Sequence, residues 1–109
     1  MGKDLIVHVG CEDKLKELVT DNATPVVLFF CGKTCVPCQQ FCPIVEDRAI
    51  NSFGKFIFAK LYVDEFESQA YKYEYQGAIP YLALVKKGKV VMSFDGVDMK
   101  LFETMMSKC

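Results

Sequence analysis

The chain has 109 residues, which is enough for one domain with one hydrophobic core and too few for two ordinary domains. Hydrophobic residues make up 51% of it and charged residues 25%, a composition typical of a soluble globular protein and not of a disordered tail. The formal net charge is -1 and the lysines are scattered, so we expect neither nucleic acid nor a membrane surface as a partner.

The N-terminal segment does not have the pattern of a targeting signal. Its apolar stretch, residues 5–9, is short and follows the charged Asp4. No apolar run approaches the roughly 20 residues that a membrane span needs. We therefore expect a cytoplasmic protein. A reducing compartment disfavours structural disulfides, so the six cysteines are not expected to form a secreted disulfide scaffold.

The first part of the chain predicts two strands with a helix between them. Residues 5–9 predict a short strand, and the spacing of apolar residues over 15–19 predicts an amphipathic helix. After a break that ends at Pro25, residues 25–30 form a continuous apolar run. Such a run is typical of a central parallel strand that is covered on both faces.

The remaining predicted elements complete an α/β pattern. In chain order they are a helix from about Cys35 to about Gly54, a strand over 56–63, a helix over 68–75, a hairpin of strands 81–85 and 90–94 with Gly88 in its turn, and a closing helix after Asp98. This order predicts one domain over residues 1–109. It has a central mixed five-stranded sheet with an antiparallel hairpin at one edge and helices on both faces.

The stretch T-C-V-P-C-Q-Q-F-C-P, residues 34–43, is where reactive side chains gather. Cys35 follows a buried strand and opens a helix, whose partial positive charge and unpaired N–H groups stabilise a thiolate. We therefore predict that Cys35 is a nucleophile. Cys38 lies one helical turn further on, close enough to form a disulfide with it, and Pro37 suits the first helical turn. Cys35 would attack a substrate disulfide, and Cys38 would resolve the mixed disulfide.

Four stretches resemble the thioredoxin family, and they extend over most of the chain. They are V-V-L-F-F-C-G-K-T-C-V-P-C-Q-Q-F-C-P, with the family's later proline at Pro43; F-I-F-A-K-L-Y-V-D-E; A-I-P-Y; and K-K-G-K-V-V-M-S-F-D-G. The resemblance implies a thioredoxin fold with a C-V-P-C active site. It also implies that Pro80 is a cis-proline, and that Val36, Pro37, Ile79 and Pro80 contact the substrate, whose main chain would pair with the backbone of Ile79.

The resemblance implies a thiol–disulfide oxidoreductase that reduces protein disulfides without a bound cofactor. Electrons would come from a separate thioredoxin reductase, which depends on NADPH. We expect a monomer, in which Cys11 and Cys109 are surface thiols that could also link dimers. A second interpretation, from another class, is a thioredoxin-like protein-binding module with little redox activity.

Three positions depart from the family pattern. Thr34 replaces the tryptophan before the first cysteine, and Val36 replaces the glycine between the cysteines. Phe29 replaces a buried aspartate that accepts the proton of the second cysteine. Lys60, which matches the lysine beside that aspartate, would lose its buried partner. We therefore predict slower resolution by Cys38 unless water or another base substitutes; the alternative is that Phe29 is a core residue without consequence for the reaction.

The spacing of four cysteines leaves a metal site as an alternative. Cys31, Cys35, Cys38 and Cys42 are spaced C-x3-C-x2-C-x3-C, which partly matches a ferredoxin ligand run. A strand end and two helical turns do not easily bring four sulfurs together, so we expect no metal. We predict that Cys42 is a small core residue and that His8 is structural.

Overall fold

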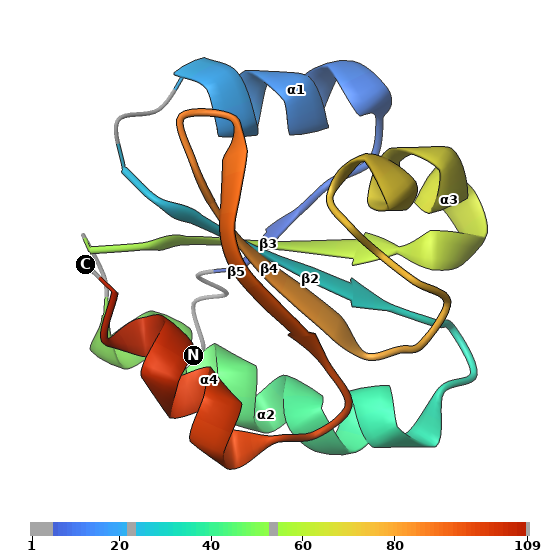
Figure 1. Cartoon of the computed structure of the whole chain (residues 1–109). Helices are drawn as coiled ribbons and strands as arrows, with labels where there is room; N and C mark the ends of the chain where they lie inside the picture. The colour runs from blue at the N-terminus through green and yellow to red at the C-terminus, as the bar shows by residue number, and fades with distance from the viewer. Residues whose placement is uncertain (1–5, 22–23, 53–54, 109) are drawn as a thin grey trace.

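The computed structural model describes residues 6–21, 24–52 and 55–108, which form one sheet with helices on both faces (Figure 1). The elements are β1 (Ile6–His8), α1 (Glu12–Asp21), β2 (Val26–Cys31), α2 (Val36–Asn51), β3 (Ile57–Tyr62), α3 (Val63–Lys72), β4 (Tyr81–Lys86), β5 (Lys89–Asp95) and α4 (Met99–Met106). The strand order is β1-β3-β2-β4-β5. The first three strands in that order run parallel, β4 is antiparallel to β2, and β5 is antiparallel to β4. The predicted mixed five-stranded sheet is confirmed.

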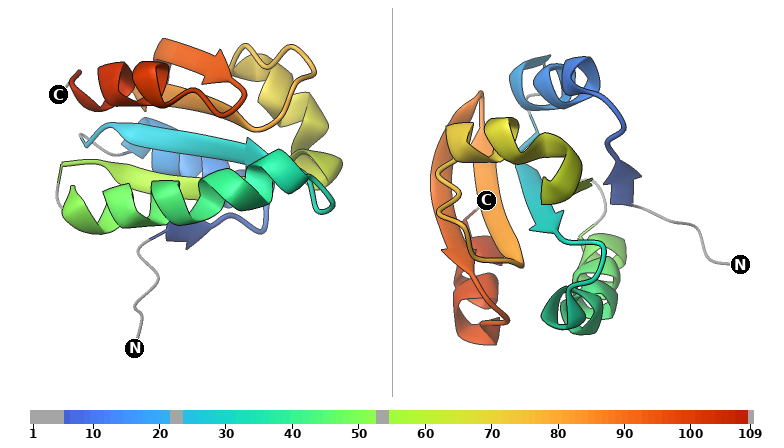
Figure 2. Two further views of the ribbon diagram at one scale, coloured as in Figure 1. Left: turned by 90° about the horizontal axis from the view of Figure 1, so that it is seen from below. Right: turned by 90° about the vertical axis from the view of Figure 1, so that its right-hand side faces the viewer.

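The two faces of the sheet are covered by different helices. Helices α1 and α3 lie on one face and α2 and α4 on the other (Figures 1 and 2). All six residues of β2 are buried, which explains its unbroken apolar sequence. Its side chains alternate between the faces, so Phe29 packs in the core below α2 and α4, while Leu28 and Phe30 pack in the core below α1 and α3.

The boundary between β3 and α3 differs from the prediction. A strand over 56–63 and a helix over 68–75 were expected, but β3 ends at Tyr62 and α3 spans Val63–Lys72. Asp64 and Glu65 lie in the first helical turn, where acidic side chains interact favourably with the helix dipole. The apolar Val63 continues the strand pattern in the sequence, and this hides the true start of the helix.

Other predicted boundaries hold to within a few residues. The predicted end of the second helix, Gly54, and the first residue of the predicted N-terminal strand, Leu5, lie outside the described residues. Helix α2 ends at Asn51, and the hairpin turns at Lys87 and Gly88, which both have positive φ, as a two-residue turn between antiparallel strands requires. Asp98 caps α4 as predicted, because its carboxylate accepts a hydrogen bond from the amide of Leu101.

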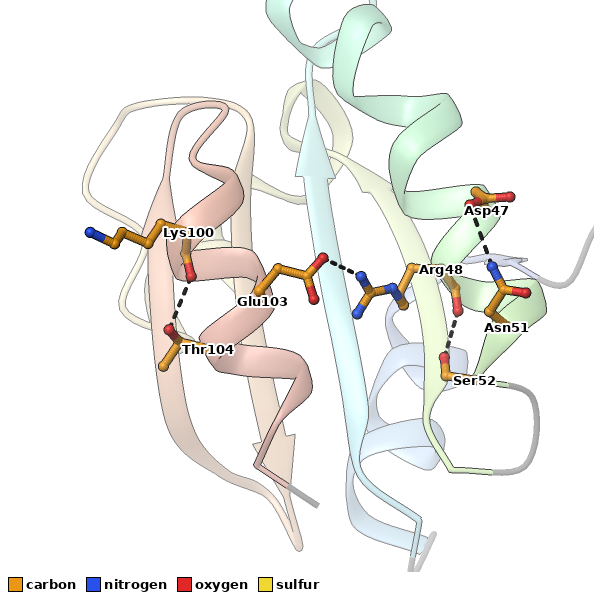
Figure 3. Close-up of polar contacts among 7 residues, drawn as sticks. All are labelled: Asp47, Arg48, Asn51, Ser52, Lys100, Glu103 and Thr104. Carbon is orange, nitrogen blue, oxygen red and sulfur yellow. Dashed lines mark hydrogen bonds and ion pairs between the residues drawn. The ribbon is translucent and has the colours of Figure 1, made fainter.

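Aromatic packing and an ion pair hold α2 against the rest of its face. The ring of Phe41 lies 6.1 Å from that of Phe29 and 5.3 Å from that of Phe102, measured between centroids. Arg48 pairs with Glu103 of α4 (Figure 3) and lies 5.7 Å from the ring centroid of Phe102. These contacts fix the helix whose first turn carries the cysteine pair. Among the described helices, none is both long and apolar enough to cross a bilayer.

Candidate active site

The first turn of α2 places Cys35 beyond the carboxyl end of β2. Cys35 is the N-cap residue, and its Sγ accepts a hydrogen bond from the backbone N–H of Cys38 at 3.1 Å. Val36 and Pro37 form the first helical residues after the cap, where the missing N–H of a proline costs no hydrogen bond. The sulfur therefore lies at the positive end of a 16-residue helix, as the sequence predicts.

Cys35 and Cys38 are joined by a disulfide, with their Cα atoms 5.2 Å apart. The structure is therefore that of the oxidised pair. The two members are unequally exposed, because Cys35 is half-buried while Cys38 is only 3% exposed. An incoming thiol or disulfide can reach the first sulfur much more easily than the second. This asymmetry suits one cysteine that meets partners and one that reacts only with its neighbour.

The loop before β4 lies against the cysteine pair. Its Ile79–Pro80 peptide bond is cis. A Cβ atom placed on Gly32 would lie 2.7 Å from Cδ1 of Ile79 and 3.4 Å from Cβ of Cys35. Gly32 is thus the residue that lets the loop approach the site so closely. Gly32 was not among the predicted site residues, and its signal in the sequence is a glycine between a strand end and the cysteine motif.

Contacts between tyrosine residues fix this loop to the rest of the domain. The hydroxyl of Tyr81, directly after Pro80, donates a hydrogen bond to the carbonyl of Tyr73 and so closes the loop at its base. The ring of Tyr81 also lies 5.7 Å from that of Tyr75 and 6.0 Å from that of Phe30. The loop is therefore fixed to the α1 and α3 face of the sheet, while the side chain of Ile79 reaches Gly32 at the site.

Charged residues near the site are paired with one another. Lys33 forms an ion pair with Glu65 at 2.8 Å, and its backbone N–H donates to the carboxylate of Asp64 at 3.4 Å. The hydrogen bond that the Lys33 ammonium donates to the Glu65 carboxylate raises the pKa of Lys33. Val36, by contrast, is a large apolar side chain that is 59% exposed. The surface next to Cys35 therefore combines an apolar residue with a neutralised charge.

Phe29 and Lys60 lie opposite each other on paired strands, but they face different surroundings. Phe29 is fully buried and packs edge-on against Phe41. The Nζ atom of Lys60 donates to Sγ of Cys42 at 3.5 Å and lies 5.4 Å from the ring centroid of Tyr62. The lysine that would have accompanied a buried carboxylate therefore contacts a thiol instead.

Cys42 lies at the boundary of the core, which differs from the predicted core position. It is half-buried, and its Sγ donates a hydrogen bond to the Glu46 carboxylate at 3.5 Å in addition to accepting one from Lys60. Cys38 packs in the core, while Cys42, one turn later, contacts Lys60 of β3. Helical spacing alone placed both cysteines on one face and could not show this neighbour.

A cavity of about 220 Å³ opens beside Cys38. Its lining consists of Cys31, Gly32, Lys33, Cys38, Gln39, Cys42, Lys60 and Tyr62. Burial raises the pKa of the Cys31 thiol to about 11, although the positive charge of Lys60 lowers it in part. Within the part of the chain that the structure describes, which includes all four closely spaced cysteines, no group of three or more potential ligands is arranged to hold a metal ion.

The other titratable candidates are not part of the cavity lining. His8 is on the edge strand β1, where it pairs in register with Lys60. Cys11 is exposed, as the sequence suggests. Cys109 lies outside the described residues, so its predicted surface position stays a prediction.

Known proteins resemble this chain in sequence and in fold. The family model described as Thioredoxin matches residues 6–107. A mitochondrial thioredoxin from Mus musculus is 33% identical over 82 residues, which cover 75% of this chain and 49% of the relative. A thioredoxin from Chlorobaculum thiosulfatiphilum is 37% identical over 73 residues, 67% of each chain. The match therefore spans about half the length of the mitochondrial relative.

Among solved structures, the crystal structure of Malassezia sympodialis thioredoxin (Mala s 13) superposes with a TM-score of 0.85. The superposition covers 97% of this chain and 92% of that one, at 23% sequence identity. This likeness shows the fold.

Proposed function

The chain belongs to the thioredoxin family, and from this we propose that it is a thiol–disulfide oxidoreductase that reduces protein disulfides. The observation that carries the proposal is the unequal pair at the start of α2. A half-buried sulfur lies at the helix N-terminus, and its disulfide partner is almost completely buried. The helix end stabilises the thiolate that attack requires.

The proposed reaction transfers two electrons from the dithiol to the substrate. The Cys35 thiolate attacks one sulfur of a substrate disulfide, forms a mixed disulfide and releases the first substrate thiolate. The Cys38 thiolate then attacks the sulfur of Cys35, forms the intramolecular disulfide and releases the second substrate thiolate. The cysteine pair is itself the redox group, so the reaction requires no bound cofactor. Electrons to regenerate the dithiol would come from an NADPH-dependent thioredoxin reductase.

Substrate would bind across the surface formed by Val36, Pro37, Ile79 and Pro80. Val36 supplies exposed apolar area, and the loop held by Tyr81 presents Ile79 next to Cys35. An extended substrate segment could pair with the backbone of Ile79 as an added strand. Gly32 belongs to this proposed surface because it sets the distance between loop and cysteine.

The proposal includes a monomer that works in the cytoplasm. Cys11, Cys31 and Cys42 are free thiols in the structure, and a reducing compartment keeps such thiols free. Cys11 is exposed and could link two chains under oxidising conditions, and the same possibility is proposed for Cys109. Size-exclusion chromatography with and without a reductant tests the monomer, and cell fractionation tests the location.

A second candidate function is a protein-binding module with little redox activity. The observation that favours it is Phe29, which is fully buried in the position that would otherwise supply a proton acceptor. In this case the same surface would hold a partner protein, and the disulfide would turn over slowly or not at all.

The deciding experiment is reduction of insulin disulfides driven by NADPH and thioredoxin reductase. We expect turnover by the wild-type protein, none by Cys35→Ser, and unchanged turnover by Cys11→Ser, a matched control at an exposed free cysteine. A parallel assay with dithiothreitol as the electron donor separates failure of the reductase to recognise the chain from failure of the chemistry. Absence of activity in both assays would favour the binding module.

A further inference from the structure

The second cysteine must lose a proton in a core where Phe29 offers no base. Cys38 is 3% exposed, and it shares its core with the fully buried rings of Phe29 and Phe41. A buried thiol in apolar surroundings resists ionisation. If Cys38 is to attack Cys35, its proton can leave through the cavity that Cys38 shares with Cys42 and Lys60.

Three consecutive turns of α2 lead from this buried sulfur to solvent. Cys38, Cys42 and Glu46 are spaced i, i+4 and i+8, so they lie on one stripe of the helix. Side chains four residues apart on a helix have Cβ atoms roughly 5–6 Å apart. The Cys42 thiol donates to the Glu46 carboxylate at 3.5 Å, and the Glu46 side chain is exposed. The cavity of about 220 Å³ has room for a water between the sulfurs of Cys38 and Cys42.

Lys60 completes this arrangement from the neighbouring strand. Its Nζ donates to Cys42 Sγ at 3.5 Å, so the ammonium lies where negative charge on that sulfur would be stabilised. Burial raises the pKa of the Cys42 thiol, Lys60 opposes the rise and Glu46 adds to it. Cys42 is therefore protonated near neutral pH, and it can give up one proton while it accepts another. The other charged or titratable groups that face the cavity are Cys31, Lys33 and Tyr62.

We propose that Cys42 and Glu46 relay the proton of Cys38 to solvent when the mixed disulfide is resolved, with Lys60 holding Cys42 in position. The inference rests on the proposed oxidoreductase function. The Cys38 proton moves to Cys42 Sγ, directly or through the cavity water, as the Cys42 proton moves to the Glu46 carboxylate, which releases it to bulk water. The Cys38 thiolate then attacks Cys35 Sγ, the bond from Cys35 to the substrate sulfur breaks, and the substrate sulfur takes the electron pair. Glu46 thus serves as the final proton acceptor, a role that the side chain of Phe29 cannot fill.

The test measures the two chemical steps separately. Reduced protein is mixed with a small peptide disulfide, quenched with acid after set times, and analysed by intact mass. The mass distinguishes the dithiol, the mixed disulfide and the intramolecular disulfide, so formation and resolution each have a rate. The variants are Glu46→Gln, Cys42→Ala and Cys42→Ser, with Asp47→Asn as a matched control, because Asp47 is an exposed acid of the same helix that contacts Asn51 (Figure 3).

We expect Glu46→Gln and Cys42→Ala to slow resolution near pH 7 by about a hundredfold or more, because a positioned proton acceptor contributes at least about that factor. Formation of the mixed disulfide should not change, since that step uses Cys35. Cys42→Ser should retain most of the rate, because a hydroxyl can also accept and donate a proton. The defect should shrink as pH rises, when hydroxide can remove the Cys38 proton. A merely structural role of Glu46 would not produce this pH dependence.

Two outcomes would overturn the inference in distinguishable ways. If the wild-type protein forms no mixed disulfide, the proposed function fails and the relay with it. If the wild-type protein turns over while Glu46→Gln and Cys42→Ala resolve as fast as Asp47→Asn, the relay is wrong and the proposed function stands.

Discussion

The buried cysteine of the pair has two unlike sides. On one side it shares a core with Phe29 and Phe41, whose rings are fully buried and meet edge-on at 6.1 Å. On the other side lies a cavity bounded by Cys31, Cys42 and Lys60. We call these the dry side and the polar side of Cys38. The two sides therefore contribute differently. The dry side stabilises the fold through packing, and the polar side has groups that can exchange a proton.

The largest expected effect comes from placing an acid on the dry side. Phe29→Asp should lower the free energy of unfolding by about 3–5 kcal/mol or more, from the loss of the buried ring alone. Burial favours the neutral carboxyl group and raises its pKa in the folded state. The variant should therefore be most stable at pH values below the ordinary pKa of an aspartate, and it should lose stability as pH rises.

Urea unfolding at pH 5 and pH 8 measures this effect. Phe29→Leu is the control, with a loss of about 1 kcal/mol that is the same at both pH values. A Phe29→Asp protein that is equally stable at both pH values would show that water reaches this position, and the distinction between dry and polar sides would fail.

Cys31, which lines the cavity, should show its burial at alkaline pH. The folded protein holds the pKa of this thiol at about 11, above its ordinary value of 9.0. The unfolded chain therefore loses the proton first, and the stability that the protonated thiol contributes is complete below pH 9 and is lost as pH rises toward 11. We expect wild-type stability to fall more steeply over this range than that of Cys31→Ala. Parallel curves from urea unfolding in the presence of a reductant would contradict the burial of this thiol.

A smaller effect is expected where the proline loop meets the site. Gly32→Ala would place a Cβ atom 2.7 Å from Cδ1 of Ile79, and that side chain would have to shift. We expect a loss of about 1 kcal/mol in binding of a protein substrate, or about fivefold in kcat/KM, with little change toward a small disulfide. Gly10→Ala is the matched control, because no atom lies within 4 Å of its added Cβ. An equal loss with both substrates would mean that the cysteines themselves had moved.

The smallest effect is expected at the solvent edge of the α2 and α4 face. The side chains of Arg48 and Glu103 are 30% and 51% exposed, and exposed ion pairs contribute about 0.2–1 kcal/mol. A double-mutant cycle with Arg48→Ala and Glu103→Ala measures their coupling. Arg48→Ala alone should cost more than Glu103→Ala, because it also removes the contact with Phe102. A coupling well above this range would show that the helices depend on the ion pair more than on the packing of Phe41 against Phe29 and Phe102.

Much of the fold follows from patterns that are local in the chain. The unbroken apolar run before the cysteines marked β2 as a central strand, and Gly88 between two apolar runs marked the hairpin. The start of α3 was missed because Val63 suits a strand as well as a helix. Its assignment depends on packing against the sheet, which the chain near Val63 does not encode.

By itself the sequence determined the order of the elements and the placement of Cys35 at a helix start with Cys38 one turn later. These features depend on residues within a few positions of one another, through hydrophobic period, capping and proline geometry. Only the tertiary structure decided that Lys60 meets Cys42 and that Gly32 admits Ile79. Each of these contacts joins segments that are distant in the chain, and the register and packing of the sheet bring them together.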